Sequence, residues 1–237
     1  MQALVLTRRD FREVDQIISF YTKDLGKLDL LAKGVKKITS KNSGNLLPGA
    51  LVEIEIAKGK EVDHLTKVQP LELFKNSRKD LKKILMVDYV VKLVDKLVSV
   101  GEKDQEVFFI LFDWLCFLER NDTVCESLIF GFIIQLFKIL GFQMDLENCI
   151  ECGTTGNFVG FSILGGGVVC GECKQSQAVV ALNRGQYNYL QKITGDWDEI
   201  NKLINKPEIF ELIHEFIQYH SEKKINRFNI EAYASIN

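Results

Sequence analysis

Four cysteines stand in two matched pairs, and this pattern constrains the fold more than any other feature of the chain. The pairs are Cys149-Ile150-Glu151-Cys152 and Cys170-Gly171-Glu172-Cys173, with 17 residues between them. Two C-x-x-C turns at this separation can converge on one tetrahedral Zn²⁺ with four thiolate ligands. Because four protein ligands leave no open coordination position, the spacing predicts one structural zinc ion and argues against a catalytic metal.

The sequence leaves other uses of these thiols open. The alternatives are four unconnected structural cysteines, iron in a rubredoxin-like site, and a redox role for either pair. We expect a cytoplasmic protein, in which thiols stay reduced, because the chain has no signal-peptide pattern and its most apolar stretch, 128–140, is too short for a membrane span. Cys116 and Cys125 lie on apolar helical faces and are interpreted as buried thiols.

The first 70 residues predict a small β-barrel. Short apolar or alternating runs, separated by Asp, Asn and Gly turn signals, are typical of strands. The expected strands are 3–6, 17–21, 27–32, 51–56 and 64–68. Five short strands in so small a region favour an OB-fold, whose face and loops often bind oligonucleotides.

After residue 70 the hydrophobic period becomes that of helices. The expected helices are 79–100, 105–119, 123–142, 186–193 and 208–224. The third is apolar around nearly its whole circumference, so we expect it at the centre of its domain. The predicted architecture is α+β and multidomain. It has an OB-fold at 1–70 and an all-helical domain at 71–237, with a zinc-binding insert at about 145–180.

The net charge of −2 is not that of a typical nucleic-acid binder, but the basic residues are unevenly distributed. No acidic residue occurs between Asp29 and Glu53. The basic residues in that gap are Lys33, Lys36, Lys37 and Lys41. The arginines that extend this patch at the first predicted turn are Arg8, Arg9 and Arg12. Such a segment can bind phosphates without reading sequence, although a solvated loop has the same composition.

Catalytic patterns are absent from the sequence. The three histidines, His64, His214 and His220, have no neighbouring nucleophile or carboxylate motif. Gly165–Gly167 lacks the Lys-Ser/Thr of a phosphate-binding P-loop. We therefore expect a protein that is not an enzyme.

Several motifs occur in order along the chain. They are Arg9-Asp10, Glu13, Asp15, Gly26-Lys27, Ala32-Lys33-Gly34, Lys36-Lys37, Ser40-Lys41, Leu47-Pro48, the run from Phe137 to Phe142, Cys149-x-x-Cys152-Gly153, Gly165–Gly167 and Cys170-x-x-Cys173. Over nearly its whole length the chain therefore resembles the RecO family of bacterial recombination mediators.

The resemblance implies an OB-fold, a helical domain with a zinc module, and a non-enzymatic role in recombinational DNA repair. Family members bind single- and double-stranded DNA and anneal complementary strands. They act with RecR, and in many bacteria with RecF, and engage the single-strand-binding protein so that RecA can load. The resemblance assigns DNA contacts to the lysines at 33, 36, 37 and 41, with Arg8 and Arg9 as further candidates.

Two other classes of protein fit the same sequence features. One is a zinc-braced adaptor that binds only proteins, which the low net basicity would suit. The other is a hydrolase or transferase in which the zinc is purely structural. Annealing of complementary oligonucleotides without a nucleotide cofactor separates a mediator from both.

Overall fold

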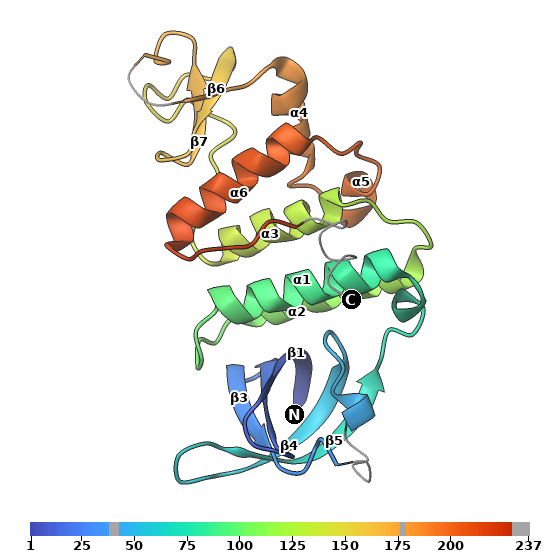
Figure 1. Cartoon of the computed structure of the whole chain (residues 1–237). Coiled ribbons are helices and arrows are strands. Elements are labelled where there is room, and N and C mark those ends of the chain that lie inside the picture. Colours follow the sequence, from blue (N-terminus) through green and yellow to red (C-terminus); the bar gives the residue numbers. More distant parts are fainter. Residues whose placement is uncertain (38–42, 176–178, 229–237) are drawn as a thin grey trace. The chain divides into compact units, whose positions relative to one another are not determined.

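Residues 2–72 form a closed five-stranded barrel, as expected from the sequence (Figure 1). This computed structural model describes residues 1–37, 43–175 and 179–228. The strands are β1 (Gln2–Asp10), β2 (Gln16–Thr22), β3 (Gly26–Ala32), β4 (Leu51–Ala57) and β5 (His64–Glu72). Their order is β1-β2-β3-β5-β4, and β1 pairs with β4 to close the barrel. The pairs are antiparallel except β3 with β5. The predicted OB-like barrel is thus confirmed.

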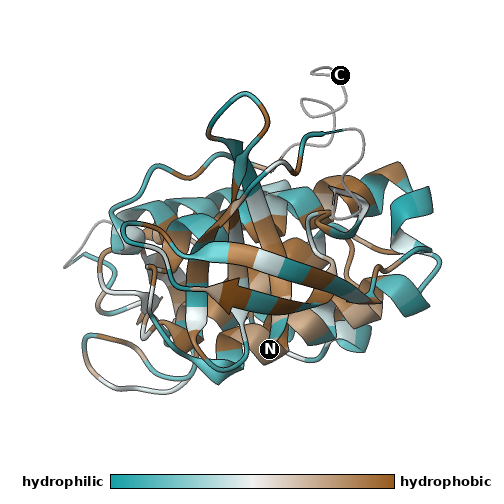
Figure 2. Ribbon diagram, turned by 90° about the horizontal axis from the view of Figure 1, so that it is seen from below, coloured by the Kyte–Doolittle hydropathy of each residue, from teal (hydrophilic) through white to brown (hydrophobic). Residues whose placement is uncertain are grey.

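Alternation of apolar and polar residues explains why these segments become strands with one buried face. In β4, Val52 and Ile54 are buried, whereas Glu53 and Glu55 between them are exposed. Phe20 and Leu30, from β2 and β3, belong to the same core. Figure 2 shows the barrel strands as hydrophobic stretches interrupted by hydrophilic residues. Burial of the inward face therefore fixes the register of the barrel.

Two helices share a structural unit with the barrel. This unit comprises residues 1–122 with Phe228, and its helices are α1 (Leu81–Leu97) and α2 (Gln105–Arg120). Asp80 caps α1 by accepting a hydrogen bond from the Lys83 backbone N–H at 3.0 Å. The cap explains why α1 begins two residues after the predicted start at 79. A short 3-10 helix, η2 (Ser77–Lys79), precedes it.

Gly49 allows close approach between α1 and the loop before β4. Its φ is +78°, and a Cβ there would lie 2.7 Å from Val87 Cγ1 of α1. Arg78 donates a hydrogen bond from Nη2 to the Pro48 carbonyl at 3.0 Å beside this position. The barrel and the first two helices are therefore packed directly against each other.

The second unit, residues 123–227, contains the remaining helices. They are α3 (Ser127–Ile139), α4 (Arg184–Lys192), α5 (Trp197–Ile200) and α6 (Pro207–Ser221). Ten of the 13 residues of α3 are buried, in agreement with the prediction that it is apolar around nearly its whole circumference. Phe130 of α3 stacks on Phe210 of α6 with ring centroids 3.8 Å apart. The predicted division into domains at 1–70 and 71–237 stays a prediction.

A small three-stranded sheet between α3 and α4 carries Cys170, the first cysteine of the second pair. Its strands are β6 (Phe158–Ser162), β7 (Gly167–Cys170) and β8 (Val180–Ala181), in the order β7-β6-β8. Phe161 packs edge-on against Phe216 of α6, with centroids 6.1 Å apart. His220 of α6 contacts the Ile163 carbonyl through Nε2 at 2.8 Å. The sheet was not predicted, and these contacts attach it to its own unit.

Candidate metal centre and nucleic-acid interface

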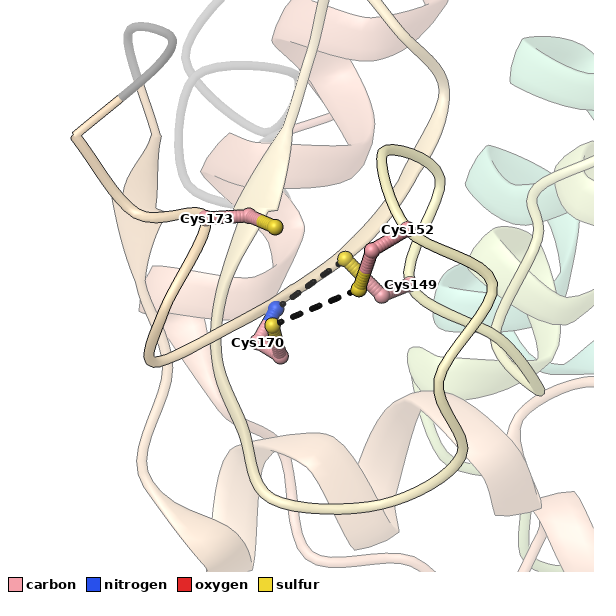
Figure 3. A group of neighbouring side chains, drawn as sticks. All are labelled: Cys149, Cys152, Cys170 and Cys173. Carbon is pink, nitrogen blue, oxygen red and sulfur yellow. Dashed lines mark hydrogen bonds between the residues drawn. The ribbon is translucent and has the colours of Figure 1, made fainter.

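The four paired cysteines converge in the folded chain. Their sulfur atoms all lie within 4.8 Å of one another, and Figure 3 shows the side chains turned toward a common centre. Cys170 ends β7, while the turn after Cys149 is closed by the Gly153 N–H, which donates to the Cys149 carbonyl at 2.8 Å. Gly153 adopts a φ of +73°, which glycine tolerates best. The backbone around both pairs therefore brings the four thiols close together around a common centre.

The sulfur spacing fits zinc. A tetrahedron with Zn–S bonds of about 2.3 Å has its sulfurs about 3.8 Å apart. Cys152 Sγ and Cys170 Sγ are 3.8 Å apart. Within the described ranges, no other group of three or more His, Cys, Asp or Glu side chains has this kind of spacing. The four thiols could hold one metal ion, and no fifth ligand is needed.

The thiols also differ in their pKa values. Burial opposes ionisation of Cys149, but hydrogen bonds from the backbone N–H groups of Cys170, Cys152 and Glu151 lower its pKa to about 6. Hydrogen bonding to Cys152, and then to Cys170, raises the pKa of Cys173 to about 12. Four adjacent thiols cannot all ionise unless a cation compensates their charge, and zinc deprotonates coordinating thiols. The donor set therefore has the chemistry of a divalent-cation site.

The segment around the cysteines has little apolar core of its own. Its buried cluster contains Cys149, Val169 and Cys170, with a few partly buried hydrophobic neighbours. So small a core does not offset the conformational entropy of ordering these loops, and small modules of this kind need a metal or a disulfide.

The other two cysteines are separate from the cluster. Cys125 Sγ donates to the Ile200 carbonyl at 3.3 Å, and burial raises the pKa of Cys116.

The predicted basic segment begins directly after β3, in a turn fixed by hydrogen bonds. The Gly34 N–H donates to Asp15 Oδ1 at 2.7 Å, and the Lys36 N–H donates to the Val14 carbonyl at 3.1 Å. Val35 is buried in the barrel core. Residues 33–37, here called the lysine turn, are thus held against residues 11–15, the β1–β2 turn.

The predicted DNA-binding residues differ in their partners. Arg9 pairs with Asp29 at 2.5 Å, and Lys36 pairs with Asp10 at 2.8 Å. The candidates that are exposed and make no ion pair with any described residue are Arg8, Lys33 and Lys37. Lys41 lies outside the described residues. Of the predicted DNA-binding lysines that the structure describes, Lys33 and Lys37 are therefore the ones available to a polyanion.

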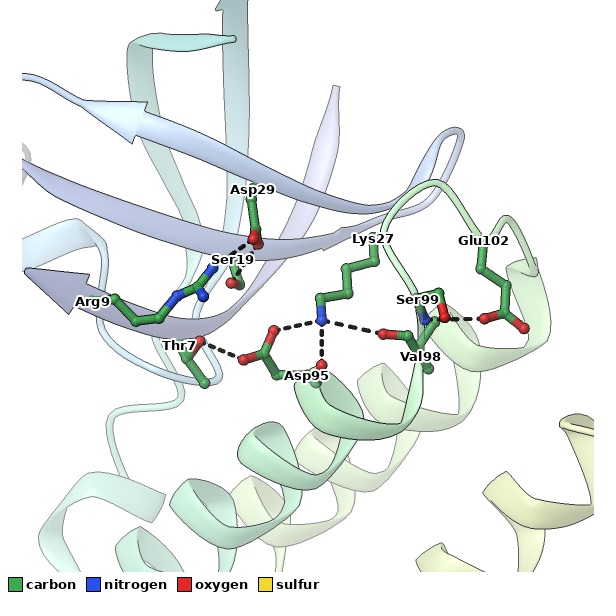
Figure 4. Close-up of polar contacts among 9 residues, drawn as sticks. All are labelled: Thr7, Arg9, Ser19, Lys27, Asp29, Asp95, Val98, Ser99 and Glu102. Carbon is green, nitrogen blue, oxygen red and sulfur yellow. Dashed lines mark hydrogen bonds and ion pairs between the residues drawn. The ribbon is translucent and has the colours of Figure 1, made fainter. Parts of the chain in front are cut away.

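Lys27, which the sequence presents as an ordinary polar strand position, is buried. Its Nζ lies 2.9 Å from Asp95 Oδ1, and it also donates to the carbonyls of Asp95 and Val98 at the end of α1 (Figure 4). Thr7 of β1 donates to the other Asp95 oxygen at 2.8 Å. Lys27 thus connects β3 to the C-terminal end of α1 and does not contribute to the basic surface.

Two of the histidines, His214 and His220, make packing contacts within the second unit. His214 is buried, which lowers its pKa, and its Nε2 lies 3.1 Å from Gln218 Nε2. His220 contacts a backbone carbonyl and packs against Phe216 with centroids 4.5 Å apart. These contacts give both side chains a role in packing.

Comparison with known proteins finds one family over nearly the whole chain. The model for "Recombination protein O N terminal" matches residues 1–74, and that for "Recombination protein O C terminal" matches 78–227. A DNA repair protein RecO from Desulforamulus reducens is 30% identical over 235 residues, covering 95% of this chain and 90% of that protein. One from Alkaliphilus metalliredigens is 25% identical, covering 98% and 95%. One from Dehalococcoides mccartyi is 30% identical, covering 89% and 85%.

Proposed function

This chain belongs to the RecO family of DNA repair proteins, and from that premise we propose that it is a recombination mediator that binds DNA backbones and anneals complementary strands. In this proposal it acts in the cytoplasm at the nucleoid, with RecR as its partner and RecF where that protein is present. It engages single-strand-binding protein on DNA so that RecA can load. The activity involves no catalysed bond change, so the protein is not an enzyme.

The observation that carries this proposal is the lysine turn fixed against the β1–β2 turn. Lys33 and Lys37 present ammonium groups that no described carboxylate neutralises. Such groups attract phosphates and release counterions, and the resulting affinity does not depend on base sequence. Annealing requires this property, because two repelling strands must be neutralised together. Lysine provides no bidentate phosphate contact, so the chain alone is expected to bind DNA weakly and RecR to strengthen binding.

The cysteine cluster has a structural role in the proposal. Cys149, Cys152, Cys170 and Cys173 would hold one Zn²⁺, which supplies four bonds that join the loop before β6 to the end of β7. The ion would have no open position for a substrate. The ion would keep the segment around the cysteines folded within the second unit, because the apolar core of that segment is small.

Alanine at both Lys33 and Lys37 is expected to weaken binding of single-stranded DNA and to flatten its salt dependence. Each lost phosphate contact on a single strand lowers the slope of log affinity against log salt by about 0.7, so two contacts lower it by about 1.4. Fluorescence anisotropy with a labelled oligonucleotide, at several salt concentrations, measures both quantities.

The matched control replaces Lys75 and Lys79, two exposed lysines with the same spacing between β5 and α1. This variant carries the same charge change and is expected to keep the wild-type slope. Equal losses in the two double variants would show a general charge effect and remove the lysine turn from the DNA surface. A wild-type chain that retains no single-stranded DNA at low salt, with or without RecR, contradicts the proposed function.

A further inference from the structure

An aromatic side chain lies exposed beside the lysine turn. Phe11, the first residue of the β1–β2 turn, has 46% of its surface exposed, and the barrel core is filled by other residues. The Arg12 guanidinium carbon lies 5.2 Å from the centre of the Phe11 ring. A phenyl ring next to a cation is the pair of groups with which proteins hold an unstacked base and its phosphate.

The backbone holds Phe11 in place. The N–H groups of Phe11 and Arg12 both donate to the Asp15 carbonyl, at 3.1 and 3.4 Å. The Asp15 carboxylate in turn accepts the Gly34 N–H of the lysine turn at 2.7 Å. The ring is therefore displayed on a closed turn that is tied to the lysines. A ligand that stacks on it has little backbone motion to restrain.

The charges around Phe11 favour an anionic ligand. Asp10 is paired with Lys36, and the Asp15 carboxylate faces the backbone of the lysine turn. Glu13 is the remaining acidic residue of the β1–β2 turn. Three positive charges, those of Arg12 and the lysines at 33 and 37, outnumber this one negative charge, and all three side chains are exposed. A phosphate chain bound along the lysine turn would bring its bases close to the ring.

We infer that Phe11 is a stacking platform for an unpaired base, and that it gives this surface a preference for single-stranded over double-stranded DNA. The inference rests on the proposed DNA-binding function and adds to it the source of the strand preference. In a duplex each base already stacks on its neighbours, so the ring has no free base face to contact. The lysines serve both forms of DNA, since they contact only phosphates.

Binding of three DNAs of equal length tests the inference: oligo-dT, a fully abasic strand and a duplex. Phe11→Ala is expected to weaken oligo-dT binding about fivefold or more, the range found when one base-stacking side chain is lost. Its binding to the abasic strand and the duplex, and its salt slope, are expected to equal those of the wild type. Phe11→Trp is expected to restore oligo-dT binding.

Phe109 of α2 provides a matched control. It is 42% exposed and has the Lys23 ammonium 5.3 Å from its ring centre, but it lies away from the lysine turn in sequence. Phe109→Ala should leave all three affinities unchanged, with thermal unfolding of each variant confirming an intact fold. Unchanged oligo-dT binding by Phe11→Ala, or an equal loss on the abasic strand, overturns the inference while leaving the proposed function in place. A wild type that binds none of the three DNAs overturns both.

Discussion

Serine in place of Cys149 is expected to reduce bound zinc from one ion per chain to nearly none. Cys149 is 2% exposed and belongs to a small buried cluster with Val169 and Cys170. A serine hydroxyl does not replace a thiolate ligand of zinc, and the three remaining thiols leave the tetrahedron incomplete. Metal binding contributes about 10–16 kcal/mol to folding in small zinc modules, far more than so small a core supplies.

The loss of metal should also unfold the module locally. Limited proteolysis is expected to cut the Cys149→Ser variant between β6 and β7, whereas the wild type resists. Elemental analysis of freshly prepared, reduced protein measures the zinc. Cys116→Ser, the same substitution outside the cluster, is the control and should retain one zinc per chain. Full zinc in Cys149→Ser, or substoichiometric metal in the wild type, would show that the four thiols are not a zinc site.

Methionine in place of Lys27 is expected to lower the free energy of unfolding of the first unit by about 3–5 kcal/mol, the usual effect of breaking a buried ion pair. Methionine keeps the aliphatic stem but removes the ammonium. Asp95 would then keep a partly buried charge, and the carbonyl of Val98 would lose its lysine donor. The hydrogen bond from Thr7 to Asp95 would remain, but it does not replace the lost ammonium, and burying polar groups with fewer partners is costly.

Lys58→Met is the matched control for this prediction. Lys58 pairs with Asp63 at 2.8 Å, but its side chain is 90% exposed. Exposed pairs contribute less than about 1 kcal/mol, so the control should be nearly neutral. Urea unfolding followed by the fluorescence of buried Trp114, in a Trp197→Phe background, reports on the first unit. Equal effects of the two substitutions would mean that Lys27 does not connect the barrel to α1.

The sequence predicted those parts of the fold that depend on local pattern. Alternation in 51–56 located β4, and the apolar run in 123–142 located the buried helix α3, since burial of one face or of the whole surface leaves its period in the sequence. The observed helix ends differ from the predicted ones by up to four residues: α1 and α3 are shorter at both ends, whereas α2 ends one residue later and α4 begins two residues earlier. The cysteine cluster was also predictable, because a C-x-x-C turn places its own two thiols together.

What the sequence did not reveal depends on contacts between distant residues. Lys27 pairs with Asp95, which lies far away in the sequence. The sequence alone does not distinguish a buried lysine from an exposed one. The partner of Arg9, Asp29, lies 20 residues away. The sheet β6–β8 has strands too short to show a reliable period. Ion pairs within the basic segment thus decide which cations are available, and composition cannot show them.

Annealing of two complementary oligonucleotides, measured by the decrease in donor fluorescence as labelled strands pair, tests the central claim most directly. The wild-type chain with RecR, and without a nucleotide cofactor, is expected to accelerate annealing over the spontaneous rate. The variant with alanine at Lys33 and Lys37 should be slower, and the variant at Lys75 and Lys79 should match the wild type. No acceleration by the wild type, alone or with RecR, would contradict the assignment of this chain as a DNA-annealing mediator.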